Sequence, residues 1–328
     1  MKLAALGEFG LIERIRRAAG KAPSIPLGIG DDCAALTVPA GELLLSTTDL
    51  LIEDVHFRRA WTSMLDLGRK SVSVNVSDIA AMGGTPQALL LAVGIPGDCA
   101  LEDLQPFLDG FLAACGDYGA TLAGGDTCRS PGPLFISVTA TGRVPQAQMV
   151  TRSGARPGDL IFVSGTLGDS AYALHELQLG RMPEPFFATR HFDPTARTRL
   201  GRELSAAGLA SAMIDLSDGL LADLGHILDA SRAGAEVDLE HLPLSASFRA
   251  VLEKDAELIE LALSGGEDYE LLFTAPPAAR ERILALARPD CDIREVGRIT
   301  AAAGDLHVKD GQGDLRHITG TGFSHFSV

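Results

Sequence analysis

The sequence contains no cysteine framework. Its five cysteines, at positions 33, 99, 115, 128 and 291, are scattered, and no two of them form a C-x-x-C pair. An odd number without paired spacing argues against a structural zinc site and against a disulfide-rich secreted fold. The N-terminal residues lack the apolar segment of a signal peptide, and no uninterrupted apolar run reaches membrane-spanning length. We therefore expect a soluble protein of the reducing cytoplasm, without a membrane partner.

Positive charge is scarce. The chain has 28 Lys and Arg residues against 43 Asp and Glu residues, which gives a formal net charge of −15. Such an excess of negative charge repels the phosphate backbone of nucleic acids and the surface of anionic lipids, so neither is expected as a partner. An acidic protein that nevertheless binds phosphates needs metal ions to screen them.

The common nucleotide and hydrolase motifs are also missing. The sequence has no G-x-x-x-x-G-K-[ST] loop, no strand–G-x-G-x-x-G–helix fingerprint, no G-x-S-x-G elbow and no H-E-x-x-H helix. If the protein handles a nucleotide, metal ions and the amides of glycine-rich loops must hold its phosphates.

The hydrophobic patterns predict two domains of alternating strands and helices. A length of 328 residues with 46% hydrophobic residues favours two domains, here 1–146 and 147–328, with the boundary in the segment around 145–147. We expect strands at 43–45, 88–95, 134–144, 160–163, 236–242, 271–274 and 293–299, and helices at 71–78, 101–118, 170–180, 193–208 and from 220 onward. This order indicates an α/β or α+β fold class.

Acidic residues recur where hydrophobic runs begin or end, usually beside Gly, Ser or Thr. A turn explains any single one of them, because Asp tolerates turn geometry and bonds its own backbone. Turn chemistry does not explain why so many of these acids adjoin hydrophobic segments, which must come together in the core. Hard oxygen ligands of this kind suit Mg²⁺, which leaves positions open for substrate phosphates and water. These acids are Asp31, Asp32, Asp49, Asp78, Asp126, Asp215, Asp218, Glu267 and Asp268.

One stretch places two carboxylates directly before a helix. Asp215, Ser217 and Asp218 follow a short apolar run, and a helical pattern begins at Leu220. The acids can cap the helix by accepting hydrogen bonds from its first N–H groups. They can also hold a metal ion or a phosphate at the helix N-terminus. For this stretch by itself, capping is the simpler interpretation.

The ordered set of motifs resembles the thiamine-monophosphate kinases, within the aminoimidazole-ribotide-synthetase-like superfamily. Each motif is weak alone, but together they cover the chain from Gly7 to Phe326. The motifs are Gly7-Glu8-Phe9, Gly28-Ile29-Gly30-Asp31-Asp32, residues 74–83, Gly124-Gly125-Asp126-Thr127, Thr151-Arg152-Ser153-Gly154-Ala155, residues 214–219 and residues 264–271.

The resemblance implies an α/β protein of PurM-like, α+β-type two-domain architecture. Its N-terminal sheet domain would bind metal and ATP and pair with its twin in a homodimer, and its C-terminal α/β domain would complete the nucleotide and substrate site. The implied activity is ATP-dependent phosphorylation of thiamine monophosphate to thiamine diphosphate with several Mg²⁺ ions, which makes the protein a thiamine-phosphate kinase with a phosphate group as acceptor.

Carried over by motif, three sets of residues receive roles. An aromatic residue that some members carry ahead of the Gly125–Asp126 pair has no counterpart here, so no adenine pocket is assigned. Without the resemblance, the simpler interpretations are that Arg152 forms a surface salt bridge and that His56 is an ordinary half-buried histidine. For Phe323, packing in the core and stacking on a ligand are equally good interpretations. The implied metal ligands are Asp32, Thr47, Thr48, Asp49, Asp78, Asp126, Asp215 and Asp218; the ATP contacts are Gly125, Asp126, Arg152 and Ser217; the thiamine contacts are His56, Glu267 and Phe323.

The chemistry of the acceptor agrees with a metal-assisted reaction. A phosphate monoester is mostly dianionic near neutral pH, because its second pKa is about 6. No general base is then required, and the difficulty is to bring two polyanions together in line, which positioning and metal charge overcome. A guanidinium such as that of Arg152 adds a fork suited to phosphate oxygens.

Two other functions remain open at this point. Another member of the superfamily, such as an aminoimidazole ribotide or selenophosphate synthetase, would act on a different phosphate-activated substrate. The latter should carry an N-terminal cysteine or selenocysteine, and residues 1–20 contain no cysteine. A non-catalytic nucleotide-binding subunit should tolerate loss of metal ligands, whereas every acid of the set is present.

Overall fold

The structure is a computed structural model that describes residues 3–29, 33–97 and 99–316, with side chains from residue 10 onward. The chain forms two compact units. The first comprises Met1–Ile79 with Gly84–Ala147, and the second comprises Ala80–Gly83 with Gln148–Val328. Two residues with predicted roles, Asp32 and Phe323, lie outside the described residues.

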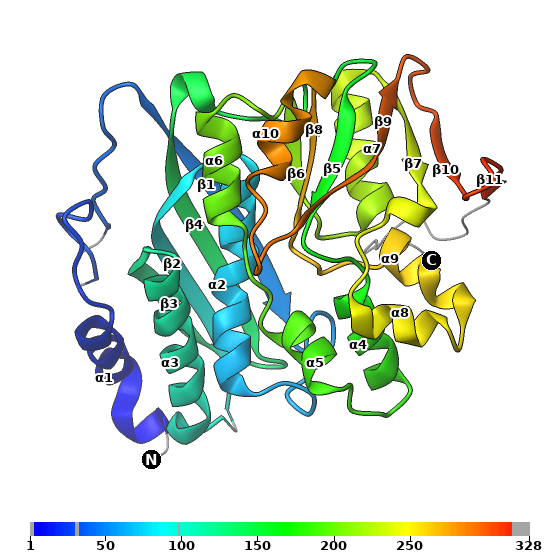
Figure 1. Ribbon diagram of the computed structural model, residues 1–328. Helices are drawn as coiled ribbons and strands as arrows, with labels where there is room; N and C mark the ends of the chain where they lie inside the picture. Colours follow the sequence, from blue (N-terminus) through cyan, green and yellow to red (C-terminus); the bar gives the residue numbers. More distant parts are fainter. Residues whose placement is uncertain (1–2, 30–32, 98, 317–328) are drawn as a thin grey trace. The chain divides into compact units, whose positions relative to one another are not determined.

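The first unit is built on a four-stranded sheet in the order β1-β4-β2-β3 (Figure 1). Its β1/β4 and β4/β2 pairs are antiparallel, and β2/β3 is parallel. The strands are β1 (Glu42–Ile52), β2 (Thr85–Pro96), β3 (Thr121–Ser130) and β4 (Phe135–Pro145), and the helices are α1 (Leu3–Ala18), α2 (Met64–Ala81) and α3 (Leu101–Asp117).

Helices α2 and α3 lie against one face of this sheet (Figure 1). Alternate strand residues such as Leu89, Leu91 and Val138 are buried there, as strand geometry requires. Val72 and Val76 of α2 are completely buried. Burying each such side chain contributes about 1.5–3 kcal/mol. The valines that alternate like a strand over 71–78 therefore form a fully buried helix, and the predicted helix there is confirmed.

The opposite face of the same sheet is open and partly apolar. Leu44 and Leu50 of β1 are 49% and 53% exposed, and Leu90 of β2 is 38% exposed. In the strand register Leu50 lies opposite Ser137 and Leu90 opposite Thr139, which places all of them on one face. This open face, defined by Leu44, Leu50, Leu90, Ser137 and Thr139, is distinct from the face covered by α2. Its part around Leu90, Ser137 and Thr139 lines a cavity that Ile12 and Ile15 of α1 also line.

The second unit contains a seven-stranded sheet in the order β11-β10-β7-β9-β5-β8-β6. All neighbouring pairs are antiparallel except β10/β7, which is parallel. The strands are β5 (Leu160–Ser164), β6 (Ala212–Asp215), β7 (Gly234–Asp238), β8 (Leu271–Ala275), β9 (Ile293–Thr300), β10 (Leu306–Lys309) and β11 (Leu315–Arg316).

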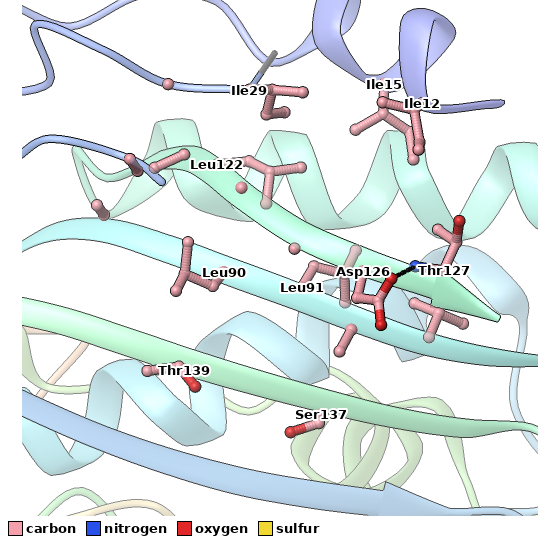
Figure 2. A pocket seen from close by; sticks show the side chains of 18 of the residues that line it. Ile12, Ile15, Ile29, Leu90, Leu91, Leu122, Asp126, Thr127, Ser137 and Thr139 are labelled. Atoms are coloured by element: carbon pink, nitrogen blue, oxygen red, sulfur yellow. Dashed lines mark hydrogen bonds between the residues drawn. The ribbon is translucent and has the colours of Figure 1, made fainter. Parts of the chain in front are cut away.

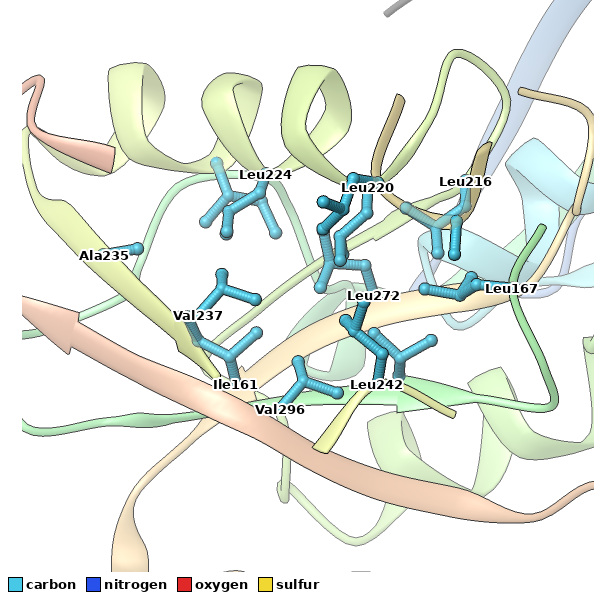
Figure 3. Packing of buried hydrophobic residues seen from close by; sticks show 14 of the residues in the cluster. Ile161, Leu167, Leu216, Leu220, Leu224, Ala235, Val237, Leu242, Leu272 and Val296 are labelled. Carbon is cyan, nitrogen blue, oxygen red and sulfur yellow. The ribbon is translucent and has the colours of Figure 1, made fainter. Parts of the chain in front are cut away.

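Helix α7 packs its apolar stripe on this sheet. Figure 3 shows Leu220 and Leu224 of α7 facing Val237, Leu272 and Ile161 from three different strands. Among the described residues, no helix combines the length and the apolar character needed to cross a bilayer. The helices of this unit are α4 (Asp169–Gln178), α5 (Pro185–Phe192), α6 (Thr198–Ala206), α7 (Leu220–Ser231), α8 (Ala246–Leu252), α9 (Glu260–Ser264) and α10 (Arg280–Leu284), with short 3₁₀ turns η1 (Gln146–Gln148, which crosses from the first unit), η2 (Leu239–His241), η3 (Ala256–Ile259) and η4 (Pro277–Ala279).

Most predicted elements are confirmed, although β1 and α2 are much longer than the predicted 43–45 and 71–78, and two other predicted elements have wrong bounds. The predicted helix at 193–208 begins only at Thr198, and Asp193 is instead the C-cap of α5. Pro194 disfavours the helical conformation for the residue before it, and Arg197 reaches a buried acid, so the intervening residues form a connection. The predicted strand at 236–242 ends at Asp238, where η2 begins.

Candidate functional site

In the first unit, β1 and α2 bring three of the predicted ligands together. Thr47 Oγ1 donates a hydrogen bond to Asp78 Oδ2 at 2.5 Å, and the Asp49 N–H donates to Asn75 Oδ1 at 3.1 Å. Asn75 and Asp78 are three residues apart on α2 and so share the helix face that meets the strand. Burial raises the pKa of Asp49 to about 6, and the Asp78 charge adds to the shift. Two carboxylates therefore share a poorly solvated place.

The hydroxyl of Thr48 lies on the other face of the sheet. It donates to the Val138 carbonyl at 3.0 Å and accepts from Thr139 Oγ1 at 3.2 Å. Successive side chains of a strand point to opposite faces, so Thr48 cannot present its hydroxyl beside Thr47 and Asp49.

Gly125 and Asp126 lie on β3, where the strand passes very close to β2. Gly125 has a φ of +152°, and a Cβ at this position would lie 1.8 Å from the Leu91 carbonyl oxygen. Only glycine fits such an approach. The next side chain, Asp126, is exposed, and its Oδ1 accepts from the Thr127 N–H at 2.8 Å (Figure 2).

A cavity of about 700 Å³ adjoins this glycine pair. Its walls are mainly apolar, with Ile12 and Ile15 from α1, Leu90 from β2 and Leu122 from β3, and Asp126 adds a carboxylate to the lining (Figure 2). The sequence did not predict this cavity, because its walls come from segments more than a hundred residues apart. The only signal in the sequence is the run of two glycines within a strand.

His56 lies in the loop after β1. Its Nδ1 accepts a hydrogen bond from the Ile52 N–H at 3.0 Å, which fixes the ring against the strand end. In the same loop the guanidinium of Arg58 lies 4.4 Å from the centre of the Trp61 ring. The loop thus presents an imidazole, a cation and an aromatic ring.

In the second unit, a carboxylate that the sequence analysis missed holds the loop that precedes α7. Asp223 Oδ2 accepts hydrogen bonds from the N–H groups of Ser217, Asp218 and Gly219, each at 3.1 Å. Burial raises the pKa of Asp223 to about 7. The N-cap residue of α7 is Gly219, which has no side-chain cap, and Asp223 in the first turn binds the N–H groups of the loop before the helix. An acid in the first turn of a predicted helix was the available signal.

Asp215 ends β6 as a buried residue, and Asp218 lies in the following loop. One ligand atom each of Asp218, Asp223 and His226 lie within 4.8 Å of one another. The predicted metal ligand Asp218 therefore has a second acid and an exposed histidine beside it.

Residues 264–270 are hydrogen-bonded to this loop along its length. The N–H groups of Glu267 and Tyr269 donate to the carbonyls of Ser217 and Leu216, each at 2.8 Å, and the Leu216 N–H donates to the Glu270 carbonyl at 2.8 Å. Glu267 and Tyr269 have φ values of +69° and +51°, which are uncommon for residues other than glycine. We call residues 215–219 and 264–270 the paired loops; they place Ser217 directly beside Glu267.

A buried ion cluster anchors the second of the paired loops. Glu270 accepts hydrogen bonds from Arg190 Nη2 at 2.9 Å, from Arg197 Nε at 2.6 Å and from Ser164 Oγ at 2.6 Å. Burial acts to raise the pKa of Glu270, but the two guanidiniums outweigh it and hold the pKa below its usual value. The sequence analysis assigned no role to these residues.

Arg152 lies in the exposed segment before β5. Its carbonyl accepts a hydrogen bond from Ser231 Oγ at 3.3 Å, and the Thr151 carbonyl accepts from the Met213 N–H at 3.0 Å. These bonds tie the segment to the edge strand β6 and to the end of α7, while the Arg152 residue itself is exposed.

Comparison with known proteins gives consistent matches over both units. Residues 30–144 match the family described as AIR synthase related protein, N-terminal domain, and residues 156–309 match its C-terminal domain. The thiamine-monophosphate kinase of Haemophilus influenzae is 40% identical to this chain over 331 residues, which covers 98% of both proteins.

Solved structures agree. The crystal structure of thiamine-monophosphate kinase from Stenotrophomonas maltophilia K279a has a TM-score of 0.84 and 41% identity and covers 93% of this chain and 96% of its own. A structure described as AaThiL complexed with AMPPCP and TMP has a TM-score of 0.77 and 38% identity and covers 99% of both chains. The two-domain α/β architecture expected from the sequence is thereby confirmed.

Proposed function

Because the chain belongs to the thiamine-monophosphate kinase family, we propose that it phosphorylates thiamine monophosphate to thiamine diphosphate with ATP. The observation that carries this proposal is the near full-length match to enzymes of that name. A relative complexed with AMPPCP, an ATP analogue, and with TMP supports the pairing of nucleotide and acceptor. The acceptor is already anionic, so the protein has to position two phosphate groups rather than remove a proton.

The donor set of the first unit suits Mg²⁺. Thr47, Asp49 and Asp78 offer oxygen ligands, and the crowding of two carboxylates in a poorly solvated place is relieved by a cation. Asp126, also in the first unit, offers a carboxylate near the proposed nucleotide site. In the second unit, Asp215 and Asp218 offer further carboxylates. Bound Mg²⁺ would neutralise phosphate charge. Asp32 and Thr48 stay predictions, and for Thr48 the side-chain hydroxyl lies on the face away from Asp49.

ATP binding is assigned to both units. The apolar cavity beside Gly125 suits a flat purine, and the Asp126 carboxylate in its lining would face the polar part of the ligand. In the second unit, the exposed guanidinium of Arg152 and the hydroxyl of Ser217 supply donors for phosphate oxygens.

Contacts to the thiamine portion are assigned to His56 and Glu267. The Glu267 carboxylate complements the positive charge of the thiazolium ring, and the Glu267 side chain remains 25% exposed. Phe323 stays a prediction from the resemblance.

Two further features belong to the same proposal. The part of the open face that β1 contributes, with exposed Leu44 and Leu50, is the surface through which the protein forms a homodimer, while Leu90 belongs to the wall of the cavity proposed for the purine. We also propose a cytoplasmic location, supported by the five free cysteines, which a reducing compartment would keep unpaired.

Turnover of the purified protein tests the function. Thiamine monophosphate and ATP should give thiamine diphosphate only when Mg²⁺ is supplied, and no product under these conditions would contradict the proposal.

Asp49→Asn and Asp126→Asn should each lower kcat by about 10²-fold or more. The melting temperature should stay nearly unchanged, because neither carboxylate is part of the ion clusters that hold the elements together. The exposed Asp109→Asn on α3 is the matched control and should retain full activity. A large loss of stability in the two variants would favour a purely structural role.

A further inference from the structure

The last turn of α5 contacts the second of the paired loops at two acids. Arg190 Nη2 donates to Glu270 Oε1 at 2.9 Å, and the adjacent residue, His191, has its Nδ1 3.4 Å from Glu267 Oε2. Arg190 also donates to the Thr166 carbonyl at 3.1 Å. Arg190 thus fixes the end of α5. As a result, His191 lies against Glu267, the residue of this loop to which a substrate contact is assigned.

His191 is a buried residue with a defined partner on its other side. It is 4% exposed, and its Nδ1 lies 3.0 Å from the hydroxyl oxygen of Ser170, a fully buried residue in the first turn of α4. Ser170 therefore limits rotation of the imidazole, and the ring cannot turn away from Glu267 without losing this contact.

The chemistry of the shared nitrogen decides which tautomer fits. Nδ1 either carries a proton and donates, or is bare and accepts. A bare nitrogen would place a lone pair against the Glu267 carboxylate, whereas an N–H gives a charge-assisted hydrogen bond to it. The Ser170 hydroxyl can accept from the same N–H. With the proton on Nδ1, the single N–H is shared in a three-centre arrangement between the Ser170 hydroxyl oxygen at 3.0 Å and the Glu267 carboxylate oxygen at 3.4 Å.

The His191 contact is made to the side chain of Glu267, whose backbone is already fixed. Its φ of +69° is maintained by the hydrogen bond from its N–H to the Ser217 carbonyl at 2.8 Å. That bond fixes the main chain and does not itself orient the carboxylate. Each unrestrained rotamer costs entropy when a ligand orders it.

We propose that His191 is a positioning residue for the acceptor substrate: held by Ser170, it orients the Glu267 carboxylate toward the cationic part of thiamine monophosphate. This rests on the proposed function and adds to it a residue that contacts neither phosphate nor metal. If His191 were only a satisfied core histidine, its loss would change stability and leave the affinity for one particular substrate unaffected.

Steady-state kinetics with two variants separate these roles. His191→Phe removes the donor and should raise KM for thiamine monophosphate about tenfold, which corresponds to one charge-assisted hydrogen bond. KM for ATP and kcat should stay within about twofold of the parent protein. His191→Asn places an amide N–H near the position of Nδ1 and should restore most of the affinity. If the phenylalanine variant does not fold, His191→Leu takes its place.

A coupling measurement and a matched control complete the test. In a Glu267→Gln background, His191→Phe should raise KM for thiamine monophosphate by less than about twofold, because the carboxylate that it orients is absent. His241→Asn alters another histidine–carboxylate pair, His241 with Asp238 at 3.5 Å, which is exposed on η2, and should leave all constants unchanged.

Two results would overturn the positioning role. One is an unchanged KM for thiamine monophosphate in all folded His191 variants. The other is a parallel rise of both KM values that the Glu267→Gln background does not suppress. Absence of turnover in the parent protein would instead contradict the proposed function itself.

Discussion

At the scale of single residues, two buried acids in one loop have opposite environments. Glu270 accepts hydrogen bonds from two arginines and a serine, and its pKa is lowered. Asp268 accepts one hydrogen bond, from the Gly168 N–H at 3.1 Å, and its Oδ1 has no partner among the described residues. Burial raises the pKa of Asp268 to about 8. Hydrogen-bond supply, and not burial alone, therefore decides which acid is ionised near neutral pH.

The pH dependence of stability tests the Asp268 environment. Because burial raises its pKa from the ordinary value of an aspartate to about 8 in the folded protein, the contribution of this group is fully present below the unfolded pKa. It is lost as the pH rises through the folded pKa. Asp268→Asn is neutral at every pH, so its melting temperature relative to the parent protein should increase between about pH 5 and pH 8.

Thermal unfolding across this pH range measures the effect. Asp109→Asn, on the exposed surface of α3, provides the baseline for a change of Asp to Asn. A melting-temperature difference for Asp268→Asn that is flat with pH would mean that Arg190 keeps Asp268 ionised.

At the scale of elements, the β2/β3 pair depends on the absence of a side chain at one position. A Cβ at Gly125 would meet the Leu91 carbonyl oxygen at 1.8 Å, so the strands would have to separate. Gly125→Ala should lower the free energy of unfolding by about 1–3 kcal/mol, as overpacking does. Urea unfolding gives the value, and Gly132→Ala is the control because nothing lies within 4 Å of its Cβ. Equal effects of the two substitutions would contradict the close approach.

The paired loops behave as one element although they are about 50 residues apart in sequence. Three backbone hydrogen bonds join them, and a Cβ at Gly266 would lie 2.4 Å from the Ser217 carbonyl oxygen. Asp223, in the first turn of α7, accepts hydrogen bonds from three N–H groups of the first loop. A shift of either loop therefore moves both Ser217 and Glu267, which couples a proposed nucleotide contact to a proposed acceptor contact.

At the scale of the whole molecule, the open face of the first unit predicts the oligomeric state. An apolar face that carries the exposed Leu44 and Leu50 on the edge strand β1 favours association with a second copy. Leu50→Asp places a charge on this face and should convert the dimer into a monomer, as light scattering after size-exclusion chromatography would show. Leu179→Asp changes an equally exposed leucine, 54%, in the second unit and should leave the dimer intact. A monomeric parent protein, or a dimeric Leu50→Asp variant, would contradict this assignment.

The sequence by itself determined the family, the fold class and most of the helices and strands. These depend on hydrophobic periodicity and on the order of short motifs, both of which are local properties of the chain. The helix at 71–78 is an example, because Asn75 and Asp78 can share a face only in a helix. The predicted functional residues cluster in the same motifs for the same reason.

Only the tertiary structure decided how side chains from distant segments meet. It placed Thr47 and Asp49 beside Asp78 but turned Thr48 to the other face, and it bound the loop before α7 to Asp223. It also brought Arg190 and His191 from α5 to acids about 80 residues later. Burial, hydrogen-bond supply and charge at these positions depend on packing between elements, and no local pattern in the sequence encodes them.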